Sequence, residues 1–127
     1  MSDTVVLKLG GEVVASPQIG RIAEGLGRLR EGGARVVVVH GGGPQLSALQ
    51  KRLQIPVRQV AGRRFTDEET LEAMKMAVAG QVNVDLCAAL RRGGLQPVGL
   101  HGAVRATKRP PRVYAGAGEA PIDLGLV

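Results

Sequence analysis

The sequence predicts an α/β fold built around a mainly parallel sheet. Two short apolar runs rich in β-branched residues, at positions 4–9 and 34–39, are typical of buried strands. A segment with helical spacing of apolar residues lies between them, and Gly-Gly pairs end both the first strand and this helix. Strand, helix and strand in this order form a βαβ unit, which predicts a parallel pair of strands with a right-handed crossover.

The first strand and the helix after it have marked ends. Residues 4–9 (TVVLKL) stop at the glycine pair 10–11, and the run is typical of a strand that is buried on both faces. Ser16 and Pro17 predict an N-cap and a first-turn proline for a helix that continues to the glycine pair 32–33. Its apolar residues recur at helical spacing: Ile19, Ile22, Ala23, Leu26 and Leu29.

The second strand, residues 34–39, leads through His40 into three consecutive glycines. Pro44 predicts the start of the next helix, and Pro56 interrupts it. One face of this helix is apolar, with Leu46, Leu49 and Leu53. Residues 56–65 are less regular, and we expect a short strand or a hairpin there.

A long helix is predicted in the second half of the chain. Residues 66–69 (TDEE) form a capping box, and apolar residues follow at steps of three or four to about Arg92, with a bend expected near Gly80. Beyond this helix, residues 96–100 are predicted to form a strand. Residues 101–120 are rich in Gly, Pro and Arg, which favours a loop or a β-hairpin over a helix.

Composition excludes several classes of protein. At 127 residues, the chain is long enough for one compact domain. No run approaches the roughly 18 apolar residues of a membrane helix, and no basic leader precedes the first strand, so we expect a soluble, cytoplasmic protein. The net charge of +6 is compatible with an anionic ligand or nucleic acid, but Phe65 and Tyr114 are the only aromatic residues available for stacking on bases. We therefore expect no nucleic acid and no membrane among the partners.

Two glycine-rich turns are the candidate ligand site. The pair 10–11 follows the first strand and the triplet 41–43 follows the second, so the parallel arrangement places both at one edge of the sheet. Glycine lets backbone N–H groups approach an anion, and the helix that begins at Pro44 adds its positive dipole end. Lys8 lies near the same edge. Because a lysine within a buried run needs a partner or a water-filled cleft, we interpret Lys8 as a functional residue suited to stabilising a phosphoryl group in transfer.

Other kinds of site are not supported. The sequence contains neither GxxxxGK[ST] nor a GxGxxG motif after a strand, so it lacks the fingerprints of P-loop and Rossmann proteins. It has no Cys/His cluster at metal-ligand spacing and no convincing serine nucleophile set, so no metal site is expected. We interpret His40 as orienting the loop that follows it, and Cys87, on an apolar helix, as a buried and inert thiol.

Four short motifs follow one another at a specific spacing: residues 6–11 (VLKLGG), 37–45 (VVVHGGGPQ), 62–67 (GRRFTD) and 98–100 (VGL). Together they resemble the motifs of the acetylglutamate kinases, which belong to the amino-acid kinase superfamily. The match spans essentially the whole chain. It implies a three-layer sandwich around the mainly parallel sheet.

The resemblance also implies a reaction. ATP with Mg²⁺ would phosphorylate the γ-carboxylate of N-acetyl-L-glutamate, a step of arginine biosynthesis, and the substrate carboxylate itself would be the nucleophile. Lys8 would stabilise the transition state, and the turn formed by Gly10 and Gly11 would approach the transferring phosphate. No protein nucleophile is then needed, because the protein contributes alignment and charge stabilisation.

For the acyl substrate, the resemblance implies three binding residues. Gly42 and Gly43 would contact the acetylglutamate, and Arg64 would bind one of its carboxylates, for which an arginine fork is well suited. Arg63 takes the place of a leucine common in the family and is given no role. Glu12 and residues 101–105 depart from the family pattern, the latter replacing a loop that commonly carries Gly-x-Asp-Gly.

The family's second half, which contains its nucleotide pocket, has no counterpart in this sequence. The apolar run 122–127 ends without a polar tail, which suggests truncation. We therefore expect residues 1–127 to form an N-terminal acyl-substrate-binding and dimerisation domain, with the ATP-binding C-terminal domain absent. The resemblance implies a homodimer, and the isolated chain should be inactive.

Three alternatives remain open at this point. The first is a related kinase that acts on another acyl amino acid, such as the carrier-protein-linked aminoadipate kinases of lysine biosynthesis. The second is a non-catalytic module that keeps the fold and cannot hold ATP. The third is a nucleic-acid binder that uses a basic stretch without acidic residues: Arg105, Lys108, Arg109 and Arg112.

Overall fold

The computed structural model describes residues 3–126. Two strands, β1 (Thr4–Leu9) and β2 (Arg35–His40), form a parallel sheet, and this confirms the predicted pairing. In the register of the sheet, Leu9 lies opposite His40. The two strands therefore end side by side, and the glycine turns that follow them start at the same edge.

Two helices lie between these strands. α1 (Gly11–Val14) is a single turn that the sequence did not predict, whereas α2 (Ile19–Glu31) matches the predicted helix. The predicted N-cap was wrong. α2 begins after Gln18, and the Ser16 hydroxyl donates to a carbonyl of α1 at 2.8 Å, so Ser16 closes α1 and Pro17 lies in the connection.

The main core lies between one face of the sheet and two helices, α2 and α5 (Asn83–Arg92). Alternate strand residues point into it, as expected for the two-residue period of a strand. The buried core residues are Leu9, Ala23, Leu26, Leu86 and Leu90, and partly buried residues such as Leu7, Val36 and Val38 pack against them.

The other face of the sheet is uncovered among residues 3–126. Val6, Val37 and Val39 are 65%, 48% and 49% exposed. The prediction that both strands are buried on both faces was therefore wrong for the described chain, because its helices cover a single face.

The helix and the hairpin predicted between residues 44 and 65 are both present in the structure. α3 (Gly43–Arg52) has a proline in its first turn, and β3 (Gln59–Val60) pairs antiparallel with β4 (Arg63–Arg64) in a short hairpin. The two residues between the strands, Ala61 and Gly62, have φ angles of 49° and 72°. Positive φ at both central residues is the usual geometry of a two-residue hairpin turn.

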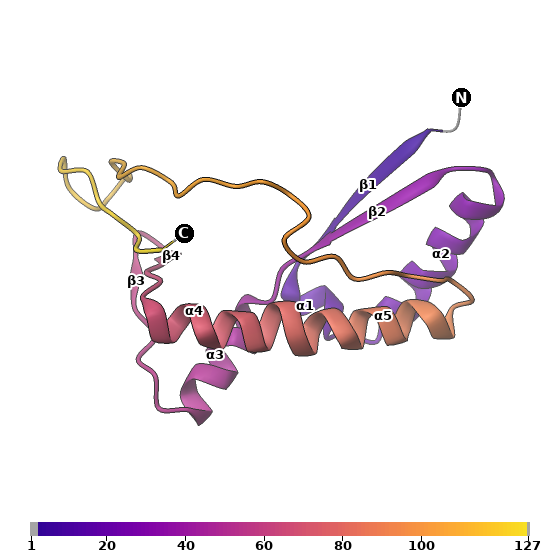
Figure 1. Cartoon of the computed structure of the whole chain (residues 1–127), viewed down its shortest axis with the longest axis horizontal. Helices are drawn as coiled ribbons and strands as arrows, with labels where there is room; N and C mark the ends of the chain where they lie inside the picture. The colour runs from indigo at the N-terminus through magenta and orange to yellow at the C-terminus, as the bar shows by residue number, and fades with distance from the viewer. Residues whose placement is uncertain (1–2, 127) are drawn as a thin grey trace.

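One long helical rod carries the rest of the regular structure (Figure 1). It consists of α4 (Glu68–Met74), the π-helical segment η1 (Lys75–Val82) and then α5, so the predicted end at Arg92 is confirmed. The backbone around Gly80 is π-helical, and Figure 1 shows the rod without the bend predicted there. The N-cap is Asp67, whose carboxylate accepts from the backbone N–H of Thr70 at 2.9 Å.

A second core cluster joins α3 to the first half of this rod. Leu46, Ala73 and Ala77 are buried there, with Leu49, Met74 and Val78 packed against them. It anchors the start of α3, and with it the glycine turn, on the rod.

Residues 95–100 form no strand, so the strand predicted at 96–100 was wrong. This stretch makes no ladder hydrogen bonds with other described residues, and Val98 and Leu100 are 79% and 74% exposed. The chain then runs back over the rod to the β3–β4 hairpin, and its last described residues lie beside the hairpin (Figure 1). Leu124 is buried there, its carbonyl accepts from the N–H of Thr66 at 2.8 Å, and Val127 lies outside the described residues.

The loop or hairpin predicted for residues 101–120 is confirmed as a loop that carries one isolated antiparallel bridge, between Arg112 and Ile122. No helix within residues 3–126 is long and apolar enough to cross a membrane.

Candidate functional site

The two glycine turns lie in direct contact. A Cβ atom added to Gly11 would be 2.9 Å from the Cα atom of Gly42 and 2.7 Å from Oε1 of Gln45. The Gln45 side chain ties the turns together, since its amide donates to the Gly11 carbonyl at 2.6 Å. The Gly41 N–H in turn donates to the Leu9 carbonyl at 2.8 Å. The predicted juxtaposition of residues 10–11 and 41–43 is therefore confirmed, and it requires glycine at position 11.

The second turn also packs on the rod. A Cβ atom at Gly42 would lie 2.9 Å from Cγ2 of Val78, a residue of the π-helical segment. The N–H groups of Gly42 and Gly43 have no hydrogen-bond acceptor among residues 3–126. They lie at the N-terminus of α3, where free amide groups and the helix dipole favour an anion.

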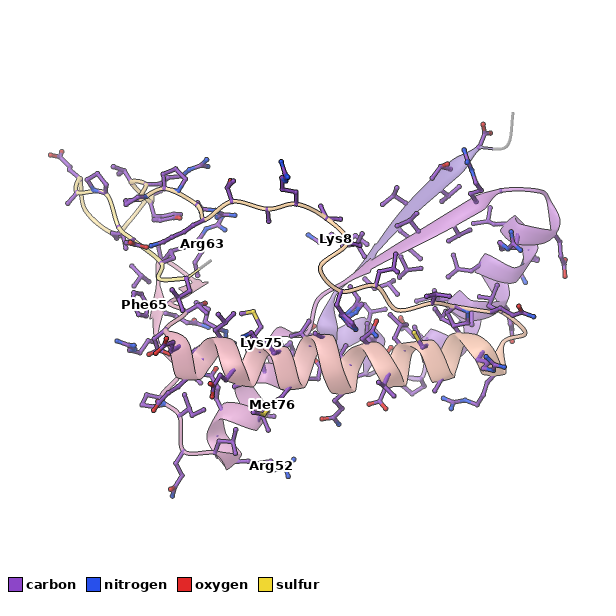
Figure 2. All side chains as sticks on the ribbon, in the orientation of Figure 1. Lys8, Arg52, Arg63, Phe65, Lys75 and Met76 are labelled. Carbon is purple, nitrogen blue, oxygen red and sulfur yellow. The ribbon has the colours of Figure 1, made fainter. Side chains whose placement is uncertain are left out.

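Lys8 lies on the uncovered face of β1, opposite Val39. Figure 2 shows it projecting from the end of the strand that leads into the glycine turn. The ion pairs among residues 3–126 join Arg58 to Asp67 and Lys108 to Asp123, so the ammonium group of Lys8 has no carboxylate partner in this part of the chain. Lys8 is exposed to solvent, and this exposure explains why the strand tolerates a charged residue.

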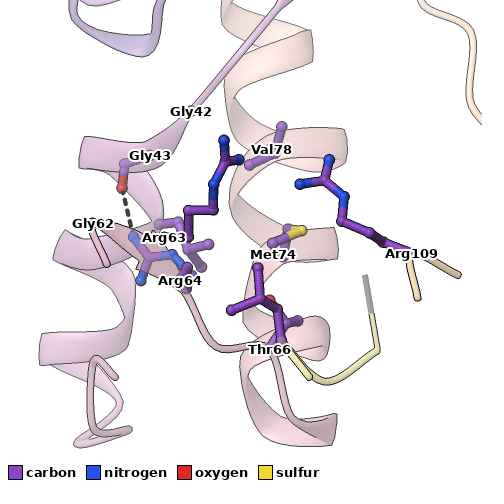
Figure 3. Close-up of a pocket in the computed structure, with 11 residues that line it drawn as sticks. Gly42, Gly43, Gly62, Arg63, Arg64, Thr66, Met74, Val78 and Arg109 are labelled. Carbon is purple, nitrogen blue, oxygen red and sulfur yellow. Dashed lines mark hydrogen bonds between the residues drawn. The ribbon is translucent and has the colours of Figure 1, made fainter. Parts of the chain in front are cut away.

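A pocket of about 560 Å³ opens beside the second glycine turn, between α3, the hairpin, the rod and the C-terminal segment (Figure 3). Three of the predicted site residues line it together: Gly42, Gly43 and Arg64. Gly10, Gly11 and Lys8 do not line this pocket. The first glycine turn adjoins the pocket through the contact between Gly11 and Gly42.

Arg64 is held in place by α3. Its guanidinium group donates to Oε1 of Gln50, to Oγ of Ser47 at 2.8 Å and, over 3.4 Å, to the Gly43 carbonyl. Burial lowers the pKa of Arg64 from its ordinary value, but an arginine stays charged at neutral pH. The result is a fixed cation beside the free amide groups of the glycine turn.

Sequence reasoning missed the residue that positions Arg64. Gln50 is 0% exposed and also donates to Oγ1 of Thr70 at 3.2 Å and to the Pro56 carbonyl at 3.3 Å. A buried glutamine must satisfy its amide, so it links α3, α4 and the hairpin. A signal was available, because Gln50 lies one helical turn after Leu46 on the apolar face of α3.

Three further pocket residues were also missed or given no role. Thr66 is 0% exposed, and its Oγ1 has no hydrogen-bond partner among the described residues. Arg63 and Arg109 come from β4 and from the returning loop, and both line the pocket. Their positions depend on how the hairpin and the loop fold over the rod, which local sequence patterns do not encode.

The remaining candidates behave as structural residues. Nδ1 of His40 lies 3.0 Å from the Gly41 carbonyl oxygen, in keeping with a role in orienting the loop. Glu12 is exposed and does not line the pocket, and Cys87 is only partly buried, not fully as predicted. A second hollow of about 550 Å³ lies between α1, α2 and the rod, where Asp85 and Arg92 are the charged lining residues. Residues 3–126 contain no group of three or more His, Cys, Asp or Glu side chains that could hold a metal ion.

Comparison with known proteins agrees with the resemblance seen in the motifs. Residues 3–116 match the model of the amino acid kinase family. The acetylglutamate kinase of Anaeromyxobacter dehalogenans strain 2CP-C is 62% identical over 128 residues, which cover 98% of this chain and 47% of that protein. The acetylglutamate kinase of Sorangium cellulosum is 61% identical, over 97% of this chain and 45% of that protein. The chain spans about half the length of these curated relatives.

Solved structures give the same fold. The Streptococcus mutans UA159 protein smu.665 superposes with a TM-score of 0.69 at 28% identity, over 75% of this chain and 38% of that chain. The N-acetylglutamate synthase of Neisseria gonorrhoeae superposes with a TM-score of 0.64 at 25% identity, over 97% of this chain and 27% of that chain.

Proposed function

The chain belongs to the amino acid kinase family, and we propose that it is the acyl-substrate-binding part of an acetylglutamate kinase. In this proposal, the pocket beside α3 binds N-acetyl-L-glutamate, whose γ-carboxylate ATP phosphorylates in arginine biosynthesis. One observation carries the proposal. Arg64, fixed by Ser47 and Gln50, lines the same pocket as Gly42 and Gly43, whose N–H groups have no acceptor among residues 3–126.

This arrangement suits a substrate with two carboxylates. The amide groups of Gly42 and Gly43, at the positive end of α3, would hold the γ-carboxylate near the contact between the two glycine turns. Arg64 would bind the α-carboxylate at a distance set by its hydrogen bonds to α3. The pocket is large enough for a small acyl amino acid, since ligand pockets start at roughly 300 Å³.

The proposed reaction needs no nucleophile from this chain. A γ-carboxylate oxygen forms a bond to the γ-phosphorus of ATP, the bond from that phosphorus to the β,γ-bridging oxygen breaks, and ADP leaves with the electron pair. Lys8, exposed at the same edge of the sheet, would stabilise the negative charge on the transferring phosphoryl group. The turn formed by Gly10 and Gly11 would leave room for that phosphate, because it places no side chain in its path.

The rest of the active site would come from a part of the protein that this chain does not include. We propose that residues 1–127 act as the N-terminal acyl-substrate-binding and dimerisation domain of a cytoplasmic enzyme, and that ATP binds mainly to a C-terminal domain. The described residues offer no cluster of metal ligands, so no step is assigned to a metal held by this chain. In the whole protein, further elements would cover Val6, Val37 and Val39 and complete the three-layer sandwich.

A chimera tests this proposal. Residues 1–127 would replace the matching N-terminal part of the Anaeromyxobacter dehalogenans acetylglutamate kinase, with which they are 62% identical. We expect the chimera to form an acyl phosphate from N-acetylglutamate and ATP, detected as a hydroxamate. Lys8→Met should lower kcat by about 100-fold, the size of effect seen when one transition-state donor is removed.

Two results would contradict the proposal. One is turnover of aminoadipate derivatives without turnover of N-acetylglutamate, which would favour the kinases of lysine biosynthesis. The other is an inactive chimera that folds and still binds ATP. For the isolated chain, calorimetry should detect no tight binding of ATP with Mg²⁺, whereas tight binding would contradict the assignment of the nucleotide to the other half.

A further inference from the structure

Two arginines that the reaction does not use flank the candidate substrate pocket. Arg63 lies on β4, next in sequence to Arg64, and Arg109 lies on the loop that returns over the rod. Figure 3 shows their guanidinium groups reaching towards Val78 from opposite sides, whereas Arg64 turns towards α3. The pocket therefore has one cation held by hydrogen bonds to α3 and two further cations in its lining.

Neither of these two arginines is neutralised by a neighbour. Among residues 3–126, no carboxylate forms an ion pair with Arg63 or Arg109; the ion pairs of this part of the chain join Arg58 to Asp67 and Lys108 to Asp123. The residues that line the pocket include three arginines and no acid. Like charges close together are unfavourable unless an anion separates them, so this arrangement favours an anionic ligand.

The structure also fixes the position of one of these arginines. The guanidinium group of Arg63 lies over the ring of Tyr114, 5.4 Å from its centroid, and Tyr114 belongs to the same returning loop as Arg109. The loop is attached to the hairpin through the Thr66 and Leu124 hydrogen bond. Arg63 and Arg109 are thus brought to the pocket by one packing arrangement.

An independent observation points to a ligand at the same place. Thr66 lines the pocket, is completely buried, and has an Oγ1 atom without a hydrogen-bond partner in residues 3–126. A buried hydroxyl without a partner is unfavourable, and a residue of the pocket lining can gain a partner when a ligand binds there.

We propose that Arg63 and Arg109 form a second carboxylate-binding arm of this pocket, which acts with Arg64 on the α-carboxylate and makes the site selective for small dicarboxylic acyl amino acids. The inference rests on the proposed function. It deepens that proposal by assigning a specificity role to two side chains outside the glycine turns and Arg64. The competing anion is a phosphate of the nucleotide, which the test below distinguishes.

The test measures dissociation constants for the 127-residue chain by NMR titration, with amide signals of α3 as reporters. The ligands are N-acetylglutamate, its α-amide, glutarate and ATP. Arg63→Gln and Arg109→Gln should each weaken N-acetylglutamate binding by about 10-fold, the usual size for one charged hydrogen-bonding contact. Both variants should bind the α-amide as the unchanged chain does, because that ligand lacks the carboxylate they contact.

Arg105→Gln is the matched control, since it removes the same charge from the same loop at a residue that does not line the pocket. It should change affinity by less than about 2-fold, as expected for an exposed charge. Equal losses in Arg105→Gln and Arg109→Gln would overturn the proposal, because net charge would then explain them. Weaker ATP binding with unchanged N-acetylglutamate binding would also overturn it.

The ligand set separates this inference from the proposed function. If glutarate binds in a manner that depends on Arg63 and Arg109 but N-acetylglutamate does not bind, the second carboxylate-binding arm is confirmed and the proposed substrate is wrong. If N-acetylglutamate binds and neither variant weakens it, the proposed substrate stands and the second arm is wrong. If neither dicarboxylate binds, both are wrong.

Discussion

The glycine edge of the site and its arginine side are built in different ways. The glycine edge consists of the backbone turns 10–11 and 41–43, which follow paired strands and touch each other directly. The arginine side consists of Arg63, Arg64 and Arg109, three long side chains on a hairpin and a loop. Backbone placed by a sheet has little freedom, whereas long side chains must be positioned by other contacts.

The two parts of the site should therefore respond to different kinds of substitution. At the glycine edge, a methyl group on Gly11 would lie 2.9 Å from the Gly42 Cα atom and one on Gly42 would lie 2.9 Å from Cγ2 of Val78, so substitutions at these two positions should act on the stability of the fold. On the arginine side, each side chain is exposed or partly exposed, so substitutions should act on binding and leave the fold largely intact. The following predictions test that division, beginning with the largest expected effect.

Gly11→Ala should be the most damaging small change. Its new Cβ atom would lie 2.9 Å from the Gly42 Cα atom and 3.0 Å from Cδ of Pro44, so the two turns would have to separate. We expect a loss of about 3 kcal/mol in the free energy of unfolding, at the upper end of what overpacking costs, because the clash involves backbone atoms. Urea denaturation measures it, with Gly10→Ala as the control.

Gly10→Ala should be almost neutral. Gly10 has an ordinary extended conformation, with φ of −68° and ψ of 155°, and nothing within 4 Å of an added Cβ atom. Equal losses of stability in Gly10→Ala and Gly11→Ala would show that the contact between the turns is not what makes position 11 require glycine.

Arg64→Ala should weaken N-acetylglutamate binding by roughly 100-fold, because it removes the charged fork proposed to bind the α-carboxylate. Arg64→Lys keeps the charge and loses the fork, so a loss of about 10-fold is expected. Titration by NMR measures both. Unchanged affinity in Arg64→Ala would remove this residue from the site.

Gly125→Ala should release the C-terminal segment without unfolding the rest of the chain. A Cβ atom at this position, where φ is 89°, would lie 2.0 Å from the Thr66 carbonyl oxygen. That carbonyl accepts from the N–H of Leu126 at 2.7 Å. We expect hydrogen exchange to lose protection at Thr66 and Leu126, with little change in the core amides.

Gly118→Ala separates crowding from backbone strain in this experiment. Gly118 has a similar φ of 92° but no atom within 4 Å of an added Cβ atom. It should keep the protection of Thr66. If both variants lose protection alike, left-handed backbone strain alone is the cause.

The smallest effect concerns Asp67, the N-cap of the rod. Hydrogen bonds from the Thr70 side chain and backbone, with a smaller effect of Arg58, lower the pKa of Asp67 to about 2. Because the folded pKa lies below the unfolded value of about 3.9, its stabilising contribution is present above about pH 4 and is lost as the pH falls towards 2. Asp67→Asn keeps an N-cap acceptor but does not titrate.

Urea midpoints of both proteins between about pH 6 and pH 2 measure this contribution. The unchanged chain should lose more stability than Asp67→Asn below about pH 4. Parallel curves for the two proteins would contradict the lowered pKa.

Sequence patterns predicted the glycine edge better than the arginine side, for a physical reason. Strands and helices are encoded by local periodicity, so the residues at strand ends, such as Leu9 and His40, could be placed at one edge. The strand predicted at 96–100 was wrong, because an apolar run forms a strand only when it pairs with another strand, and residues 95–100 pair with neither edge of the β1–β2 sheet. The N-cap at Asp67 instead of Thr66 is an error of one residue at a helix boundary.

The arginine side could be predicted only through resemblance to a family, and then only for Arg64. Gln50 positions Arg64 through a side chain that crosses from α3 to the hairpin. Local sequence patterns do not predict such contacts. Arg109 is 45 positions from Arg64 in the sequence. Arg109 reaches the pocket only because Leu124 docks against Thr66, and no sequence motif predicts that contact.

A map of N-acetylglutamate binding on the 127-residue chain by ¹⁵N NMR tests whether the pocket beside α3 is the substrate site. We expect saturable shifts centred on the backbone amides of Gly42 and Gly43 and on the Nε–H of Arg64. No saturable shift, or shifts confined to the second hollow around Asp85 and Arg92, would contradict that assignment.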